Sequence, residues 1–82
     1  MHKVRRLIRY FDKKADPLLG EIDFPEVSLR KLQQMFNIPE SNPMYDCYII
    51  EGANAEFFMN LTGKKFDLEK YVYFLECDAI EE

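Results

Sequence analysis

The sequence predicts a small α+β domain built from a four-stranded sheet, with elements in the order ββαβαβ and two short helices on one face. Residues 71–75 are all apolar or aromatic and include a β-branched Val, which is typical of a strand covered on both faces. Residues 19–24 carry the alternation of a half-buried strand, and residues 29–36 place apolar side chains at helical spacing. We therefore expect residues 71–78 to form a long strand in the middle of the sheet.

The first two strands are expected to form an antiparallel hairpin. Residues 4–11 mix β-branched, aromatic and Arg residues in a loose alternation, which suits a strand with one face in water. Residues 12–17 are polar and end in Pro, so they predict the hairpin loop. In the second strand, residues 19–24, the acidic Glu21 and Asp23 face away from the apolar residues.

The first helix is expected to begin after Ser28, which is a favourable N-cap residue, and to end at Asn37 and Pro39. Its apolar stripe consists of Leu29, Leu32, Met35 and Phe36. At this spacing the stripe predicts a helix that packs on the sheet.

The second half of the chain predicts a strand, a short helix and the long last strand. The β-branched and aromatic residues of 45–50 favour a third strand. Asn54 is the expected N-cap of the second helix, and Gly63 stands where a left-handed C-terminal residue belongs. The charged segment 64–70 should turn the chain into the last strand. A right-handed crossover between parallel strands is one way to connect them, and it would give a mixed sheet. Residues 79–82 are expected to be a frayed acidic tail.

Length and charge indicate one domain, residues 1–82, with an acidic body. A chain of this size buries only about 60% of the surface that its unfolded form exposes, so it has little room for a deep cavity. Residues 1–14 carry a net charge of +5 and the rest of the chain −9, for a total of −4. This balance argues against nucleic acid and for a basic protein partner. The alternative is an acidic surface that only keeps the protein soluble.

Residues suited to catalysis or metal binding are few. Cys47 and Cys77 lack the short spacing of a zinc site and are expected to be buried, reduced thiols. The single histidine, His2, lies at the start of the chain, so no Ser-His or Cys-His pair is proposed. Glu76 and Asp78 could do acid–base work only in a pocket that such a small chain does not favour. No catalytic, cofactor or metal site is predicted, and the protein is expected not to be an enzyme.

No membrane association is expected either. Charged residues follow Met1, and no apolar run approaches about 18 residues. The sequence therefore predicts a cytoplasmic protein.

Tyrosines beside acidic residues on the predicted strands indicate a surface for a basic protein. Tyr48 and Tyr73 are the expected anchors, because tyrosine offers a large contact area with few rotatable bonds. The expected charge contacts are Asp46, Glu51, Glu56, Glu69, Glu76 and Asp78. These rings could equally belong to the core.

Three arginines of the first strand carry the opposite charge. Arg5, Arg6 and Arg9 could bind phosphate, but pairing with Glu21 and Asp23 of the neighbouring strand is the more ordinary role.

A family resemblance is carried by Leu19-Gly20-Glu21 and by residues 43–48, 55–58 and, above all, 65–77. With these segments the chain resembles a family of small bacterial proteins, some of which look like immunity proteins of contact-dependent growth inhibition and related polymorphic toxin systems. The resemblance implies a cytosolic protein that binds and neutralises a cognate toxin domain, often a basic nuclease. It assigns no role to single residues.

Two hypotheses follow from the sequence. The first is an immunity protein that occludes the active site or substrate surface of its toxin, and a monomer is expected. The second is a structural or regulatory module that self-associates through an open sheet face or a sheet edge.

Overall fold

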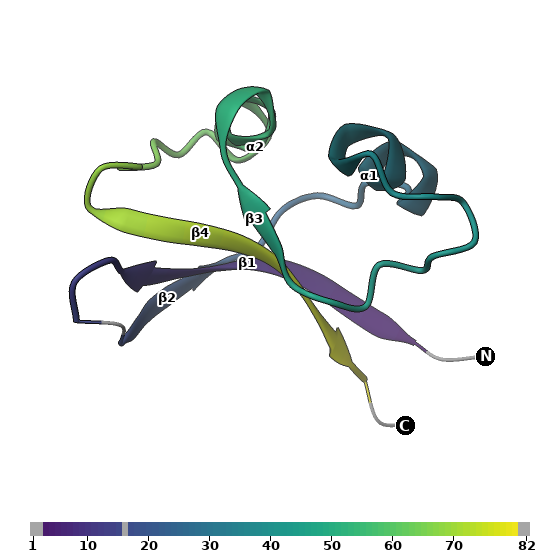
Figure 1. Ribbon diagram of the computed structural model, residues 1–82, viewed down its shortest axis with the longest axis horizontal. Helices are drawn as coiled ribbons and strands as arrows, with labels where there is room; N and C mark the ends of the chain where they lie inside the picture. Colours follow the sequence, from purple (N-terminus) through teal and green to yellow (C-terminus); the bar gives the residue numbers. More distant parts are fainter. Residues whose placement is uncertain (1–2, 16, 81–82) are drawn as a thin grey trace.

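A computed structural model describes residues 3–15 and 17–80. The strands are β1 (Val4–Asp12), β2 (Leu18–Ile22), β3 (Tyr48–Ile50) and β4 (Tyr71–Ala79), and the helices are α1 (Leu29–Phe36) and α2 (Gly52–Thr62). The strands form one sheet in the order β2-β1-β4-β3, and both helices lie on the same side of it (Figure 1). The predicted α+β class, the element order and the helices on one face are confirmed.

The long last strand, β4, lies inside the sheet as expected. It pairs with β1 over nine residues, from Val4 opposite Ala79 to Asp12 opposite Tyr71, and with β3 through residues 73–75. The apolar residues at the start of β4 are explained by this position, because neighbours lie on both sides of the strand.

All neighbouring strands are antiparallel, so the parallel crossover that the sequence allowed before β4 does not occur. The helix α2 is 11 residues long and spans about 16 Å. Residues 63–70 carry the chain back over that distance, so that β4 starts beside the end of β3, with Tyr73 opposite Ile50. A parallel arrangement would have required β4 to start at the other end of the sheet.

The hairpin between β1 and β2 closes through Asp12, whose carboxylate accepts hydrogen bonds from the N–H groups of Lys14 (2.8 Å) and Ala15 (3.0 Å). These two donors, that of Ala15 first, hold the pKa of Asp12 below its ordinary value. The register of the pair shifts between Tyr10 and Phe11. Gly20 lies opposite Tyr10, where a Cβ atom would stand 2.8 Å from the phenolic oxygen, so the ring occupies the space of a side chain.

The helix boundaries are set by local capping, and one cap differs from expectation. As predicted, the hydroxyl of Ser28 caps α1 by accepting from the N–H of Lys31 (3.2 Å), and the helix ends at Asn37. Asn37 adopts the left-handed conformation. Gly63 ends α2 in the same conformation. Asn54 was wrongly predicted as the N-cap: α2 already starts at Gly52, and the Asn54 amide donates to the carbonyl oxygen of Met35 (3.1 Å), which ties the two helices together.

The core lies between the sheet and the helices. Its buried members are Ile8, Ile22, Leu32, Met44, Ile50, Ala55, Phe58, Phe66, Tyr73 and Leu75. The ring of Phe66 stacks on that of Tyr73 with centroids 4.3 Å apart, so the turn before β4 also contributes to the core.

The third strand is shorter than predicted, because only residues 48–50 pair with β4. Cys47 precedes it and is exposed, which corrects the expectation of a buried thiol, whereas Cys77 is partly buried in β4. Both thiols are free. The chain bends at Asp46 and joins the sheet only at Tyr48, so Cys47 lies outside the paired part of the strand.

The expected frayed tail is ordered at its start. Ala79 belongs to β4, and the N–H of Ile80 donates to the carbonyl oxygen of Lys3 (2.9 Å). Residues 81–82 lie outside the described residues. Over residues 3–15 and 17–80, no helix is long and apolar enough to cross a membrane.

Candidate functional site

The side of the sheet that faces away from both helices is the candidate site, and we call it the open face (Figure 1). Ile8 and Leu75 lie opposite each other in the core and point to the helices. Because side chains alternate along a strand, the residues next to them in sequence point to the open face. One part of the open face, the ion cluster, consists of Arg5, Arg9, Glu21, Asp23, Glu76 and Asp78. The other part, the apolar patch, consists of Phe11, Leu18, Ile49, Val72 and Phe74.

Arg9 is the centre of the ion cluster. Its Nε donates to Glu21 (2.8 Å), its Nη1 to Glu76 (2.9 Å) and its Nη2 to Asp78 (2.6 Å). Nη1 also donates to the second carboxylate oxygen of Asp78 (2.9 Å), so that pair is bidentate. Arg5 pairs with Asp23 at 2.6 Å. The expected pairing of Arg5 and Arg9 with Glu21 and Asp23 is thus confirmed, although Asp23 lies just beyond the end of β2.

The pairing of Arg9 with Asp78 favours the ionised form of both groups. Its hydrogen bonds, first that to Asp78 and then that to Glu76, raise the pKa of Arg9. The bond from Arg9 likewise lowers the pKa of Asp78. Two arginines face four carboxylates, so the cluster keeps a net charge of −2. Leu7, whose Cα pairs with that of Glu76, is fully buried on this face beneath the charged side chains.

Arg6 does not take part, contrary to the expectation that all three arginines pair with β2. It is one residue out of phase with Arg5 and therefore points to the helix side. There its Nη2 donates to the carbonyl oxygen of Pro43 (2.8 Å).

The apolar patch lies beside the cluster. The rings of Phe11 and Phe74 meet edge to face with centroids 5.9 Å apart, and Ile49 and Leu18 remain 47% and 51% exposed. A hollow of about 180 Å³ is lined by Phe11, Cys47, Phe74 and Glu76, and it joins the patch to the ion cluster. Half-exposed aliphatic side chains next to aromatic rings are typical of a surface that a partner covers.

The structure brings only two of the eight predicted contact residues onto the open face, Glu76 and Asp78. Tyr73 is 4% exposed, and its hydroxyl accepts from the N–H of Asp67 (3.0 Å), so it is a core residue and not an exposed anchor. Tyr48 is half-buried on the helix side, with its ring 5.8 Å from that of Phe36.

The remaining four predicted contacts are exposed but scattered. Asp46 precedes β3, Glu51 precedes α2, Glu56 lies on α2 and Glu69 lies in the turn before β4. These residues spread negative charge around the molecule without forming one surface.

Sequence reasoning missed the apolar patch. Its signal was present in the phase of β4: Glu76 and Asp78 must share a face with Phe74 and Val72, because all four are separated by even steps. If these four side chains point to the open face, Tyr73, which lies between Val72 and Phe74, must point to the core.

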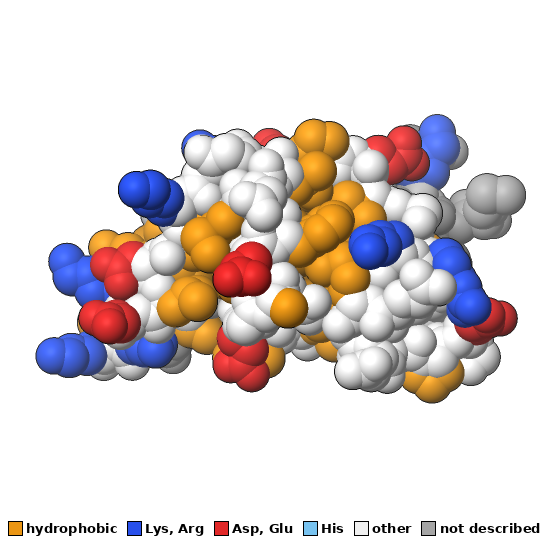
Figure 2. Space-filling model, turned by 90° about the horizontal axis from the view of Figure 1, so that it is seen from above, with side chains coloured by type: hydrophobic (Ala, Val, Ile, Leu, Met, Phe, Trp, Pro, Cys, Tyr) orange, Lys and Arg blue, Asp and Glu red, His pale blue; other side chains and the backbone are white. Residues whose placement is uncertain are grey.

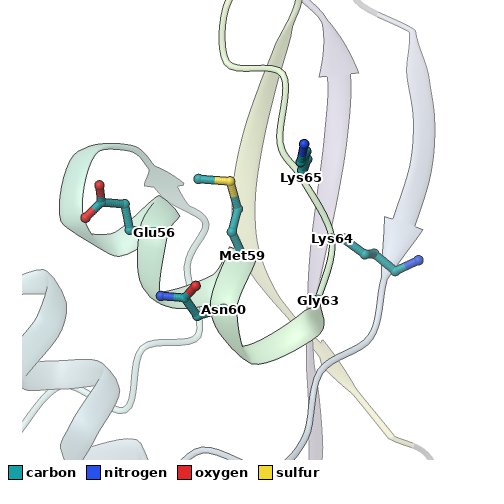
Figure 3. Close-up of a pocket in the computed structure, with 6 residues that line it drawn as sticks. All are labelled: Glu56, Met59, Asn60, Gly63, Lys64 and Lys65. Carbon is teal, nitrogen blue, oxygen red and sulfur yellow. The ribbon is translucent and has the colours of Figure 1, made fainter.

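A larger hollow, of about 610 Å³, lies at the end of α2 (Figure 3). It is lined by Glu56, Met59, Asn60, Gly63, Lys64 and Lys65. The first three project from α2, and Lys64 points away from the helix (Figure 3). No hydroxyl, thiol or imidazole group lines this hollow, and its ionisable side chains are those of Glu56, Lys64 and Lys65.

Two other features of the surface bear on function. The helix-bearing side carries hydrophobic side chains along its middle with charged ones around them (Figure 2). Partly buried Phe36 and Phe57 of the helices pack against the core there, and Lys31 covers the Phe57 ring at 5.5 Å. Among the described residues, no group of three His, Cys, Asp or Glu side chains could hold a metal ion.

Residues 5–76 match a protein family described as Domain of unknown function (DUF7683). The chain belongs to this family. The match runs from β1 into β4 and contains the whole apolar patch and every member of the ion cluster except Asp78. No curated protein matches the chain. The family's description names no activity, so the resemblance to immunity proteins stays a prediction.

Proposed function

We propose that the protein is an immunity protein that binds a cognate bacterial toxin domain with a basic surface and neutralises it. The observation that carries this proposal is the open face, where an apolar patch adjoins an ion cluster with a net charge of −2. The proposal also draws on the family resemblance and on the acidic body of the chain.

The two parts of the open face would contribute differently to binding. Burial of Ile49, Leu18 and the neighbouring rings would supply most of the affinity, because apolar burial contributes about 25 cal/mol per Å². The acidic surplus would speed the approach of a cationic protein and exclude acidic ones. The internal pairs fix the carboxylates in place before binding, so little side-chain ordering remains to oppose it.

Neutralisation on this proposal needs no covalent step. A bound immunity protein covers the active site of the toxin or the surface that binds its substrate, and its carboxylates occupy the place of substrate phosphates. The protein would act in the cytoplasm, where such a toxin meets its substrate, and it would not be an enzyme.

A growth assay tests the proposal. The toxin domain encoded beside the gene is induced with and without this protein, and the two proteins are then co-purified. Rescue of growth together with a stable complex supports the proposal. The proposal is refuted if the neighbouring protein is not toxic, or if this protein neither restores growth nor binds the toxin.

A pair of variants with equal charge change locates the surface. Ile49→Lys places a charge in the apolar patch and is expected to weaken binding by about tenfold or more. Gln34→Lys adds the same charge to the exposed side of α1 and should bind like the parent protein. Equal affinities for the two variants would remove the open face from the interface. A sedimentation coefficient that rises with concentration, and that Ile49→Lys abolishes, would instead favour self-association through this face.

A further inference from the structure

The strand β4 extends beyond its neighbour β3 and leaves part of one edge unpaired. β3 covers β4 only at residues 73–75, whereas β4 continues to Ala79 and is paired with β1 along that whole length. We call residues 76–79 the β4 overhang.

Hydrogen-bond phase shows which backbone groups of the overhang are unpaired. The bond from the Ile80 N–H to the Lys3 carbonyl makes Lys3 and Ile80 a bonded pair of the β1–β4 ladder. Because bonding alternates along an antiparallel strand, Glu76 and Asp78 also bond to β1, and the N–H and C=O groups of Cys77 and Ala79 point outward. Among the described residues, no hydrogen bond from the chain before β3 reaches these four groups.

The two faces beside the overhang differ in chemistry. On the helix side, a hollow of about 300 Å³ is lined by Val4, Tyr45, Cys77 and Ala79. On the open face stand Glu76 and Asp78 of the ion cluster. A strand added at this edge would therefore place alternate side chains in an apolar hollow and against carboxylates.

We propose that the β4 overhang accepts an extended segment of the partner as an additional strand, with apolar and basic residues in alternation. This inference rests on the proposed function and names how the toxin domain is held. The outward groups of Cys77 and Ala79 bond the backbone of the segment, the hollow takes its apolar side chains, and Glu76 and Asp78 face its basic ones.

A second copy of this chain is a poorer occupant. Antiparallel pairing of two overhangs would bring Glu76 and Asp78 of one copy against the same residues of the other, and like charges directly opposite destabilise a sheet. Charge complementarity thus selects a basic segment.

Binding of defined peptides to the full chain tests the edge itself. The probe is a capped seven-residue peptide of alternating valine and lysine, and amide exchange is followed by NMR. We expect the amides of Cys77 and Ala79 to exchange more slowly when the peptide is bound. A peptide with glutamate for lysine, and one with every second amide N-methylated, should each bind about tenfold more weakly or worse.

Two proline variants locate the site on the chain. Ala79→Pro removes only an outward N–H and should abolish peptide binding, whereas Ala53→Pro removes an N–H in the exposed first turn of α2, outside the sheet, and should leave it intact. Unchanged exchange at Cys77 and Ala79 in the presence of the peptide overturns the inference, as does loss of binding in Ala53→Pro with retention in Ala79→Pro. The N-methylated peptide gives the same answer on the parent protein if Ala79→Pro does not fold.

The two proposals fail in different ways. If Ala79→Pro rescues growth like the parent protein while Ile49→Lys does not, the immunity function stands and the overhang has no part in it. If the peptide slows exchange at the overhang but this protein does not restore growth in the presence of the toxin, the edge binds basic strands and the immunity function is refuted.

Discussion

Replacing Arg9 by Met tests whether the ion cluster stabilises the fold. Met keeps an apolar stem beside Leu7 while removing the guanidinium that joins Glu21, Glu76 and Asp78. We expect the free energy of unfolding at pH 7, measured by urea denaturation, to fall by about 2 kcal/mol.

The magnitude follows mainly from one carboxylate. The Glu76 side chain is only 16% exposed, and a hydrogen bond between such a group and a charged partner contributes about 1.5–3 kcal/mol. Glu21 and Asp78 are 41% and 39% exposed, so solvent screens their pairs with Arg9 and these add less.

The loss of stability caused by Arg9→Met should be smaller in acid. Arg9 lowers the pKa of Asp78 in the folded state, so this group stabilises the fold above the ordinary carboxyl pKa, and the contribution is lost as the pH falls through the folded pKa. The parent protein loses this contribution on acidification, and Arg9→Met lacks it at every pH. The difference in unfolding free energy between the two proteins should therefore shrink as the pH falls below the ordinary carboxyl pKa of about 3.9.

A surface ion pair provides the matched control. Arg30 pairs with Glu40, and both side chains are more than half exposed, so Arg30→Met should change stability by less than about 0.5 kcal/mol. Equal losses for Arg9→Met and Arg30→Met, or a loss for Arg9→Met that stays constant as the pH is lowered from 7 until the carboxylates are protonated, would refute this account of the cluster.

Three further predictions concern the core and the caps. Phe58→Ala should cost about 3–5 kcal/mol in urea denaturation, because the ring is fully buried, and a loss below 1 kcal/mol would contradict that packing. Ser28→Ala should cost about 1 kcal/mol through loss of the bond to the Lys31 N–H, and Ser28→Asp should restore most of it. Burial raises the pKa of Tyr73, so the neutral ring stabilises the fold and this contribution is lost as the pH rises above about 10. Tyr73→Phe should show a weaker decline of the melting temperature in that range, and an identical decline would place the alkaline transition elsewhere.

The helices and the hairpin could be predicted because their signals are local. Ser28, Asn37 and Gly63 act through bonds to residues a few positions away, and the structure confirms all three. The start of α2 was misjudged because Asn54 bonds across to α1, and capping rules do not include a tertiary partner.

Strand direction and strand length were harder to predict from the sequence, because they depend on segments that are distant along the chain. Whether β4 runs parallel or antiparallel to β3 is decided by the path of residues 63–70, and nothing in the composition of either strand encodes it. β3 begins later than predicted, because the chain bends at Asp46 and joins the sheet only at Tyr48, although its sequence favours a strand from residue 45.

The candidate site was half predictable. Arg5 and Arg9 were correctly paired with β2, since cross-strand neighbours of opposite charge are a short-range inference once the hairpin is known. The apolar patch is assembled from β1, β2, β3 and β4, so it exists only once their order in the sheet is fixed.

The pairing of β1 with β4 also shapes how the chain can fold. These two strands form the middle of the sheet, yet about 60 residues separate the end of one from the start of the other. On the ribosome, β1 would wait without its principal partner until residues 71–79 have emerged, with Leu7 and Ile8 uncovered. The central ladder therefore forms only after residues 71–79 have been made, and its formation requires closure of this long loop.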